Sequence, residues 1–307
     1  MEIKPPFYHA KLMLTEEIPL YVFLVKGADY SVFIDSGVAP MFDALVETMN
    51  TAGVADSDLK FILNTHSHHD HIGCNASIKD KTGCFIAAPA HYLKWHSDFE
   101  VHYKEFARPF PDFFPDTPEL RSEALDPLDA EHKVDLIIDE GSAFDLGGGV
   151  KLTAYSFPGH MLAELGWFEE STKTLILADA ITGLDWPLTH GHLTVSGYRD
   201  SIEKIDRLLD ELDVKQVYMA HYDPMTPDEM RALTQKAREY VDGIETTVIR
   251  VAAENETVTL KTLWEEFLKR HNKLTEFRSL STIDAHVKDL IERRVLKEVG
   301  PQTYALI

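Results

Sequence analysis

This chain contains little cysteine. It also lacks long hydrophobic runs and an N-terminal segment that resembles a secretory signal. Only Cys74 and Cys84 occur in 307 residues, and their spacing indicates neither a disulfide framework nor a cysteine-based zinc site. Both are expected to be small buried thiols. No segment reaches the roughly 20 apolar residues that a membrane helix needs, and the start MEIKPPFYHAKLML has no basic region or cleavage site. We therefore expect a cytoplasmic protein with no membrane span.

Basic residues are also few relative to acidic ones. The chain has 30 Lys and Arg against 51 Asp and Glu, which gives a formal net charge of -21. This balance argues against a broad affinity for phosphate backbones and favours a solvated acidic surface. The length, with 44% hydrophobic residues, suffices for one large domain or a main domain with a small appendage.

Strand-like and helix-like segments alternate along the chain. Short apolar, β-rich runs lie in 20–37, 58–66, 83–89, 142–160, 163–181 and 215–221, and helical periodicity lies in 41–53, 196–212 and 227–254. Such alternation, with repeated hairpins, predicts a layered α/β sandwich.

Residues 91–133 interrupt this pattern with an aromatic-rich insertion. Aromatic residues recur there at mostly helical intervals, at Tyr92, Trp95, Phe99, Tyr103, Phe106 and Phe110, which predicts an amphipathic helix followed by a proline-broken loop. The helix could simply pack on the core, form a dimer contact in a homodimer, or cover an apolar substrate pocket as a lid. We favour the lid, with Trp95, Phe99 and Phe106 as substrate contacts.

The tail reads as a separate module, which divides the chain into 1–250 and 251–307. Helices are predicted over 257–271 and 281–296, followed by short strands around a Gly-Pro turn in 297–307, and this order resembles a winged helix. A nucleic-acid reader would place the second helix in a groove, but that helix mixes acidic with basic residues. A module that docks on the main domain or on a partner subunit is therefore favoured over nucleic-acid binding.

The segment LNTHSHHDHIG, residues 63–73, crowds histidines after an apolar run, although histidine makes up only 15 of 307 residues. His66 and His68 share one face of an extended segment, and Asp70 and His71 can point to a second position once the chain turns into a helix. One loop can thus reach two metal ions. Further candidates follow apolar runs elsewhere, at His160, Asp179 and His221. Each alone is more often a turn residue, but together they indicate a metal site.

With HSHHDH followed in order by His160, Asp179 and His221, residues 15 to 245 resemble the metallo-β-lactamase superfamily. The resemblance implies a four-layer αββα sandwich and, given the tail, the branch with an appended winged-helix domain. It also implies the ligands: His66, His68 and His160 for a first metal, Asp70, His71 and His221 for a second, and Asp179 between them. Asp70 is also expected to act in catalysis. Asp35 matches the family's early aspartate, which contacts a metal ligand without binding the metal itself. The alternative is that Asp35 is an ordinary turn residue.

Two divalent ions that share a water lower its pKa from 15.7 toward 7 and so generate hydroxide at neutral pH. Imidazole-rich ligation favours zinc, with iron and manganese as alternatives. We expect a metal-dependent hydrolase acting on a small molecule with an ester-like bond, such as a lactone, thioester or ester. The segments after His160 (Met161 to Glu164) and after His221 (Tyr222 and Asp223) depart from the family pattern and leave the substrate open. His190 and His192 are further candidate substrate contacts.

The sequence leaves other activities open. A phosphodiesterase or ribonuclease would use the C-terminal module to hold nucleic acid, and its binding would depend steeply on salt. The superfamily's sulfur-dioxygenase branch would use a single iron held by two histidines and one aspartate. A binding protein that has kept its metals without catalysis is the non-enzymatic alternative.

Overall fold

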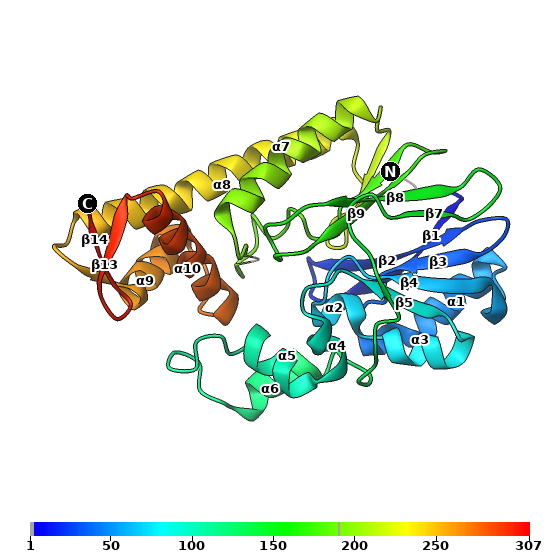
Figure 1. Cartoon of the computed structure of the whole chain (residues 1–307), viewed down its shortest axis with the longest axis horizontal. Coiled ribbons are helices and arrows are strands. Elements are labelled where there is room, and N and C mark those ends of the chain that lie inside the picture. The colour runs from blue at the N-terminus through cyan, green and yellow to red at the C-terminus, as the bar shows by residue number, and fades with distance from the viewer. Residues whose placement is uncertain (1–2, 190) are drawn as a thin grey trace. The chain divides into compact units, whose positions relative to one another are not determined.

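A computed structural model describes residues 3–189 and 191–307. The chain divides into two compact units, drawn in Figure 1 along one colour gradient. The first unit comprises Met1–Phe157, Ala163–Asp179 and Leu208–Met230, and the second comprises Pro158–Leu162, Ala180–Arg207 and Arg231–Ile307. The domain boundary predicted between residues 250 and 251 stays a prediction.

The first unit is built on two β-sheets. Within the described residues, one sheet has the strand order β1-β2-β3-β4-β5-β6 and the other β11-β10-β9-β8-β7. Strands β3 to β6 run parallel, as do β10 and β11, whereas the remaining neighbours are antiparallel. The first sheet contains β1 (Phe7–Met13), β2 (Pro19–Lys26), β3 (Ser31–Ile34), β4 (Leu59–Leu63), β5 (Phe85–Ala88) and β6 (Leu136–Ile137). The second contains β7 (Ala143–Asp145), β8 (Lys151–Ser156), β9 (Leu165–Glu169), β10 (Thr174–Ile176) and β11 (Gln216–Tyr218).

Alternate side chains of the central strands enter two separate cores. In β2, Phe23 packs between the sheets in one cluster with Trp167 of β9. Its neighbour Val22 packs on the opposite face in a cluster with Leu45 of α1. Successive side chains of a strand point to opposite faces, so a sheet covered on both sides needs apolar residues at every position. This burial explains the continuous apolar runs in the sequence.

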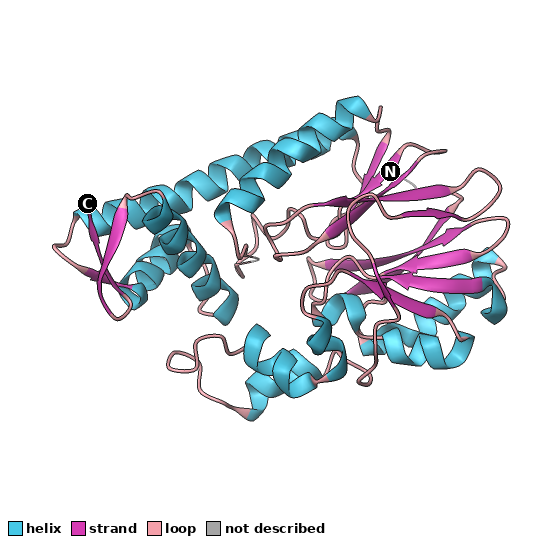
Figure 2. Ribbon diagram, viewed as in Figure 1, coloured by secondary structure: helices cyan, strands magenta, loops and turns pink. Residues whose placement is uncertain are grey.

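Helices α1 and α3 lie along the outer face of the first sheet, as Figures 1 and 2 show. The helix predicted over 41–53 is confirmed as α1, and it ends at Gly53, whose φ of 64° suits the left-handed cap that glycine favours. The helical segments of the first unit up to residue 157 are η1 (Ala39–Met41), α1 (Phe42–Ala52), η2 (Asp56–Asp58), α2 (His69–Ile72), α3 (Asn75–Thr82), α4 (Leu93–Ser97), α5 (Phe99–Phe106) and α6 (Pro118–Leu125).

The prediction of one amphipathic helix at the start of the insertion is wrong, because two helices form there. The aromatic stripe spans two short helices, α4 and α5, which are separated at Asp98. The Asp98 side chain accepts a hydrogen bond from the backbone N–H of Val101, an N-cap that starts α5. Trp95 is 2% exposed and Phe106 8% exposed, so the stripe packs inward.

The second unit is mostly helical and ends in a small sheet. Its helices include most of α7 (Val195–Glu211) and of α8 (Pro227–Ala253), together with α9 (Leu260–His271) and α10 (Phe277–Glu292). In the described part of the chain, β12 (Val258–Thr259), β13 (Leu296–Gly300) and β14 (Thr303–Leu306) pair in the order β12-β14-β13. The predicted helices and strands are present, and their assignment as a winged helix stays a prediction. None of the described helices is long and apolar enough to span a membrane.

Both cysteines are free and buried, as the sequence predicts. Burial raises the pKa of Cys74 to about 12 and also raises that of Cys84. At pH 8 a thiol with that pKa is ionised in only about one molecule in ten thousand. We therefore expect Ellman's reagent to label neither thiol in the native protein and to label both after unfolding in guanidinium. Rapid labelling of the native chain would contradict this placement.

Candidate metal centre

The histidine-rich segment forms a loop between β4 and the short helix α2. Strand β4 ends at Leu63, and α2 begins at His69, just after the extended residue His68. The rings of His66 and His68 meet edge to face, with 3.1 Å between Nε2 of His66 and Nδ1 of His68. The predicted sharing of one face by these two side chains is therefore present.

Further candidate ligands lie at the ends of two parallel strands in the second sheet. Asp179 follows β10 and His221 follows β11. Because β10 and β11 run parallel, their carboxyl ends lie at the same edge of the sheet. Oδ2 of Asp179 is 3.4 Å from Nε2 of His221 and 3.6 Å from Nε2 of His71. Segments that are distant in the sequence thus converge on one point.

Within the described residues, two groups of potential metal ligands lie inside the first unit. Ligand atoms lie within 4.8 Å of one another in each group, one formed by His66, His71 and Asp179 and the other by Asp70, His71 and His221. All are buried except Asp70, which is partly exposed. The shared histidine makes the two groups neighbours, as a centre for two ions requires.

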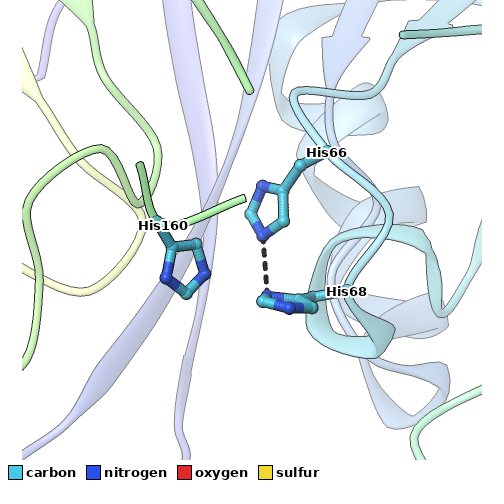
Figure 3. A group of neighbouring side chains, drawn as sticks. All are labelled: His66, His68 and His160. Carbon is cyan, nitrogen blue, oxygen red and sulfur yellow. Dashed lines mark hydrogen bonds between the residues drawn. The ribbon is translucent and has the colours of Figure 1, made fainter. Parts of the chain in front are cut away.

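His160 belongs to the second unit, in the loop that joins β8 to β9. The loop is closed by a 2.8 Å hydrogen bond from N–H of Phe157 to the carbonyl of Glu164. Nδ1 of His160 lies 2.8 Å from the carbonyl oxygen of Gly191. Figure 3 draws the side chains of His66, His68 and His160, and its dashed line marks the 3.1 Å contact between Nε2 of His66 and Nδ1 of His68. With Nδ1 engaged, Nε2 of His160 is the nitrogen suited to a metal.

Asp35 lies behind the loop and is 4% exposed. It accepts hydrogen bonds from the backbone N–H of Thr65 at 2.7 Å, from the Thr65 hydroxyl at 2.9 Å and from Nδ1 of His71 at 2.9 Å. Because the Thr65 hydroxyl donates its hydrogen bond to Asp35, its oxygen accepts a hydrogen bond from Nδ1–H of His66 at 3.1 Å. These contacts fix the tautomers, so that His66 and His71 present Nε2 to the cluster. Asp35 is therefore hydrogen-bonded to the histidine-rich loop, and its predicted role of supporting a metal ligand stays a prediction.

Charges of both signs alternate within the cluster. Burial alone would raise the pKa of Asp70 and of Asp179, but the neighbouring imidazoles outweigh burial and hold both pKa values well below their usual range. Burial likewise opposes protonation of His71 and His221. The surrounding carboxylates nevertheless raise the pKa of His71 well above its usual value and that of His221 to about 10. The carboxylates are therefore ionised, and a metal ion must displace protons from the imidazoles when it binds.

The donor set fits a pair of divalent ions. Imidazole nitrogens and carboxylate oxygens are the ligands of zinc, and they also suit iron and manganese. Nε2 of His71 is buried and has no hydrogen-bond partner among the described residues, although such atoms in proteins are normally satisfied. It points toward carboxylate oxygens of Asp70 and Asp179, at 3.9 and 3.6 Å. The histidine and aspartate clusters are thus consistent with a dinuclear metal site.

Glu164 is a site residue that the sequence did not reveal as one. It is fully buried, and its Oε1 accepts a 2.8 Å hydrogen bond from the backbone N–H of Asp179. The same oxygen lies 3.9 Å from Nδ1 of His66. Burial, together with the nearby Asp179 carboxylate, raises the pKa of Glu164 well above its usual value. In the sequence it stood out only as a departure from the family pattern after His160.

The residues predicted to contact substrate lie in different parts of the structure. The ring centroid of Phe106 lies 4.8 Å from that of His68, and Trp95 stacks on the same histidine at 6.2 Å. Phe99 is half-buried at the start of α5. His192 is buried, with Nε2 2.9 Å from Nε2 of His286, so it is not a solvated loop residue. His190 lies outside the described residues, and contact of any of these side chains with substrate stays a prediction.

An αββα scaffold that carries a buried histidine and aspartate cluster defines a metal-binding protein. Residues 17–221 match the profile of the metallo-beta-lactamase superfamily. The match covers well over half of the chain, which therefore belongs to this superfamily. Membership and the histidine-rich site are together consistent with a metal-dependent hydrolase.

Solved structures share the fold over the whole chain. A metallo-beta-lactamase family protein from Thermus thermophilus is 20% identical, with a TM-score of 0.72 and 100% of each chain covered. A beta-lactamase domain protein from Burkholderia ambifaria is 14% identical, with a TM-score of 0.74, and the alignment covers 100% of this chain and 94% of that one. At such identities the likeness establishes the αββα fold and the presence of an additional C-terminal helical and sheet region.

A curated relative matches over a short segment. The chain is 41% identical over 51 residues to a hydroxyacylglutathione hydrolase of a Bradyrhizobium species. The segment amounts to 17% of this chain and spans only 19% of the relative's length.

Proposed function

We propose that this protein is a dinuclear metal-dependent hydrolase that cleaves an ester-like bond of a small molecule, with a thioester as the first choice and a lactone or simple ester as the others. The observation that carries the proposal is that two neighbouring groups of potential ligands, His66 with Asp179 and Asp70 with His221, gather around His71 in the first unit. The short match to a hydroxyacylglutathione hydrolase supports the thioester.

We propose the following ligands for the two ions. The first ion would be held by His66, His68 and His160, the second by Asp70, His71 and His221, and Asp179 would contact both. The grouping of Asp179 with His66 and His71, and its 3.4 Å approach to His221, support a shared position. Zinc is the proposed metal, because imidazole dominates the donor set.

When bound, the ions would supply hydroxide at neutral pH and polarise the scissile carbonyl. Asp70 is the ligand candidate best placed to act on the attacking water. Its side chain is 15% exposed whereas that of Asp179 is fully buried, so a substrate can approach Asp70. Because its pKa stays well below the usual range, the ionised carboxylate can accept a hydrogen bond from that water and orient it.

The apolar portion of the substrate is proposed to lie against the insertion. Trp95 and Phe106 contact His68 from the insertion side, and aromatic side chains supply large apolar contact areas. Direct contact with substrate would require the insertion to expose these nearly buried rings, as a lid does when it opens.

A substrate panel tests this function. Protein loaded with zinc, iron or manganese, and protein stripped by a chelator, would be assayed with thioesters, lactones, esters and phosphodiesters. We expect thioester hydrolysis that chelation abolishes and added zinc restores. Cleavage of phosphodiesters alone, or oxygen uptake with one iron per chain, would overturn the proposal.

A further inference from the structure

A row of hydrogen-bonded, buried polar side chains lies behind the metal loop, which is the histidine-rich loop between β4 and α2. The row is on the side of this loop away from the ligand groups. Its members are Asn64, Ser67, Asn75, His96 and His132, which we call the anchoring network. Ser67, Asn64, Asn75 and His96 are each at most 2% exposed, and His132 is half-buried. Buried polar groups that are all hydrogen-bonded hold a structure in one arrangement.

The hydrogen bonds of the network run in one direction. Nδ1 of His132 lies 3.0 Å from the carbonyl oxygen of Ala130, which can only accept, so this nitrogen carries the proton. Nε2 of His132 is then an acceptor, and it accepts a hydrogen bond from Nδ1–H of His96 at 3.0 Å. Nε2 of His96 in turn accepts from the Ser67 hydroxyl at 3.0 Å. Both rings are thus neutral, which agrees with burial lowering the pKa of His96 well below its usual value and also that of His132.

The bond to Ser67 sets the direction of the two neighbouring ligands. In an extended segment, residue i+1 points to the face opposite to residues i and i+2. Ser67 points to His96, whereas His66 and His68 meet each other at 3.1 Å. Holding the serine on one face therefore holds both imidazoles on the other.

The same network also holds the far end of the loop. Asn75 donates to Oδ1 of Asn64 at 2.8 Å and lies 3.1 Å from Nε2 of His132. Asn64 donates in turn to the carbonyl of His71 at 3.2 Å. The loop is thus fixed both at Ser67 and at His71, on either side of Asp70.

The two histidines of the network come from opposite ends of the insertion of residues 91–133. The backbone also joins these ends, because N–H of His132 donates to the carbonyl of His96 at 2.7 Å. On the assumption that the proposed metal site is correct, we propose that His96 is a positioning residue for the metal loop. The base of the insertion is then part of the metal centre, in addition to any role of the insertion as a lid.

Measuring zinc affinity distinguishes a role of His96 in positioning the metal ligands from a role that only stabilises the fold. Zinc alone would be titrated in competition with a chromophoric chelator, and unfolding temperatures would be measured with and without zinc. We expect His96→Leu to weaken zinc binding about tenfold or more, the range seen when residues that orient metal ligands are changed. The stabilisation that zinc confers should shrink accordingly. His96→Gln, which can still accept from Ser67, should recover part of the affinity.

Two further variants complete the test. Ser67→Ala removes only the hydroxyl and should weaken zinc binding in the same direction, so it tests the proposal even if His96→Leu fails to fold. His102→Phe is the matched control, because His102 is another fully buried histidine of the insertion, and its ring centroid lies 4.7 Å from that of Trp95. Its zinc affinity should stay within about twofold of wild type, since His102 lies outside the anchoring network.

The proposal would be overturned if Ser67→Ala and His96→Leu bound zinc as tightly as wild type while unfolding at a lower temperature without metal. That result would give the network a purely structural role. Failure of the proposed function is a different outcome, because it appears in the wild-type protein as absent metal-dependent hydrolysis. The comparison of zinc affinities does not depend on that activity.

Discussion

Replacing Asp179 with alanine should strip the protein of its metal and lower kcat/KM for the hydrolysed substrate about a thousandfold or more. The Asp179 side chain is fully buried, and Oδ2 lies 3.6 Å from Nε2 of His71 and 3.4 Å from Nε2 of His221. Without this carboxylate, the two proposed ions lose the ligand that they share. The ions supply several kcal/mol of transition-state stabilisation, and each 1.36 kcal/mol is a factor of ten in rate. Elemental analysis and steady-state kinetics on the same preparation measure both effects.

Asp185→Ala is the matched control for Asp179→Ala. Asp185 lies shortly after Asp179 in the chain, but its side chain is 76% exposed and pairs with Lys236 at the surface. An exposed pair of this kind contributes little to stability. The control should keep wild-type metal content and activity. A folded Asp179→Ala protein that also kept its full metal content would show that Asp179 is not a ligand.

Replacing Asp35 with alanine should destabilise the metal-free protein by about 3 kcal/mol and weaken zinc binding about 10- to 100-fold. Three donors converge on this buried carboxylate, two from Thr65 and one from His71. Alanine would leave all three without an acceptor in a region that excludes water, and His71 would lose the contact that orients its ring. Denaturant unfolding without metal and zinc competition titration measure the two effects separately.

Thr65→Val provides a graded comparison for Asp35. The variant keeps the shape of residue 65 and its backbone N–H but removes the hydroxyl that links Asp35 to His66. Its effects on stability and zinc affinity should have the same sign and be smaller. Equal stability and zinc affinity for Asp35→Ala and wild type would reduce Asp35 to the turn residue that the sequence left as an alternative.

The candidate ligands could be predicted because each follows an apolar strand. The carboxyl ends of parallel strands share one edge of a sheet, so Asp179 after β10 and His221 after β11 meet there as expected. Strands covered on both faces give strong apolar runs, which made β2, β3 and β4 visible in the sequence. Edge strand β1 alternates irregularly between buried and exposed residues, and β6 has two exposed residues, so neither was predicted.

The residues that support the ligands could not be found from the sequence in the same way. His96 and Ser67 are 29 positions apart, and Asp35 and Thr65 are 30 apart. No local pattern connects such partners, and isolated polar residues in a sequence resemble surface positions. Aromatic spacing continues across the break between α4 and α5, so this spacing does not predict the break, and the capping Asp98 is the single local signal for it.

Metal stoichiometry tests the central claim most directly. Elemental analysis would be carried out on wild-type protein purified without added metal, and again after chelation and reloading with zinc. The seven proposed ligands predict two divalent ions per chain, both removed by the chelator and both restored by zinc. One iron per chain, or zinc that does not rise above trace levels on reloading, would contradict the dinuclear site.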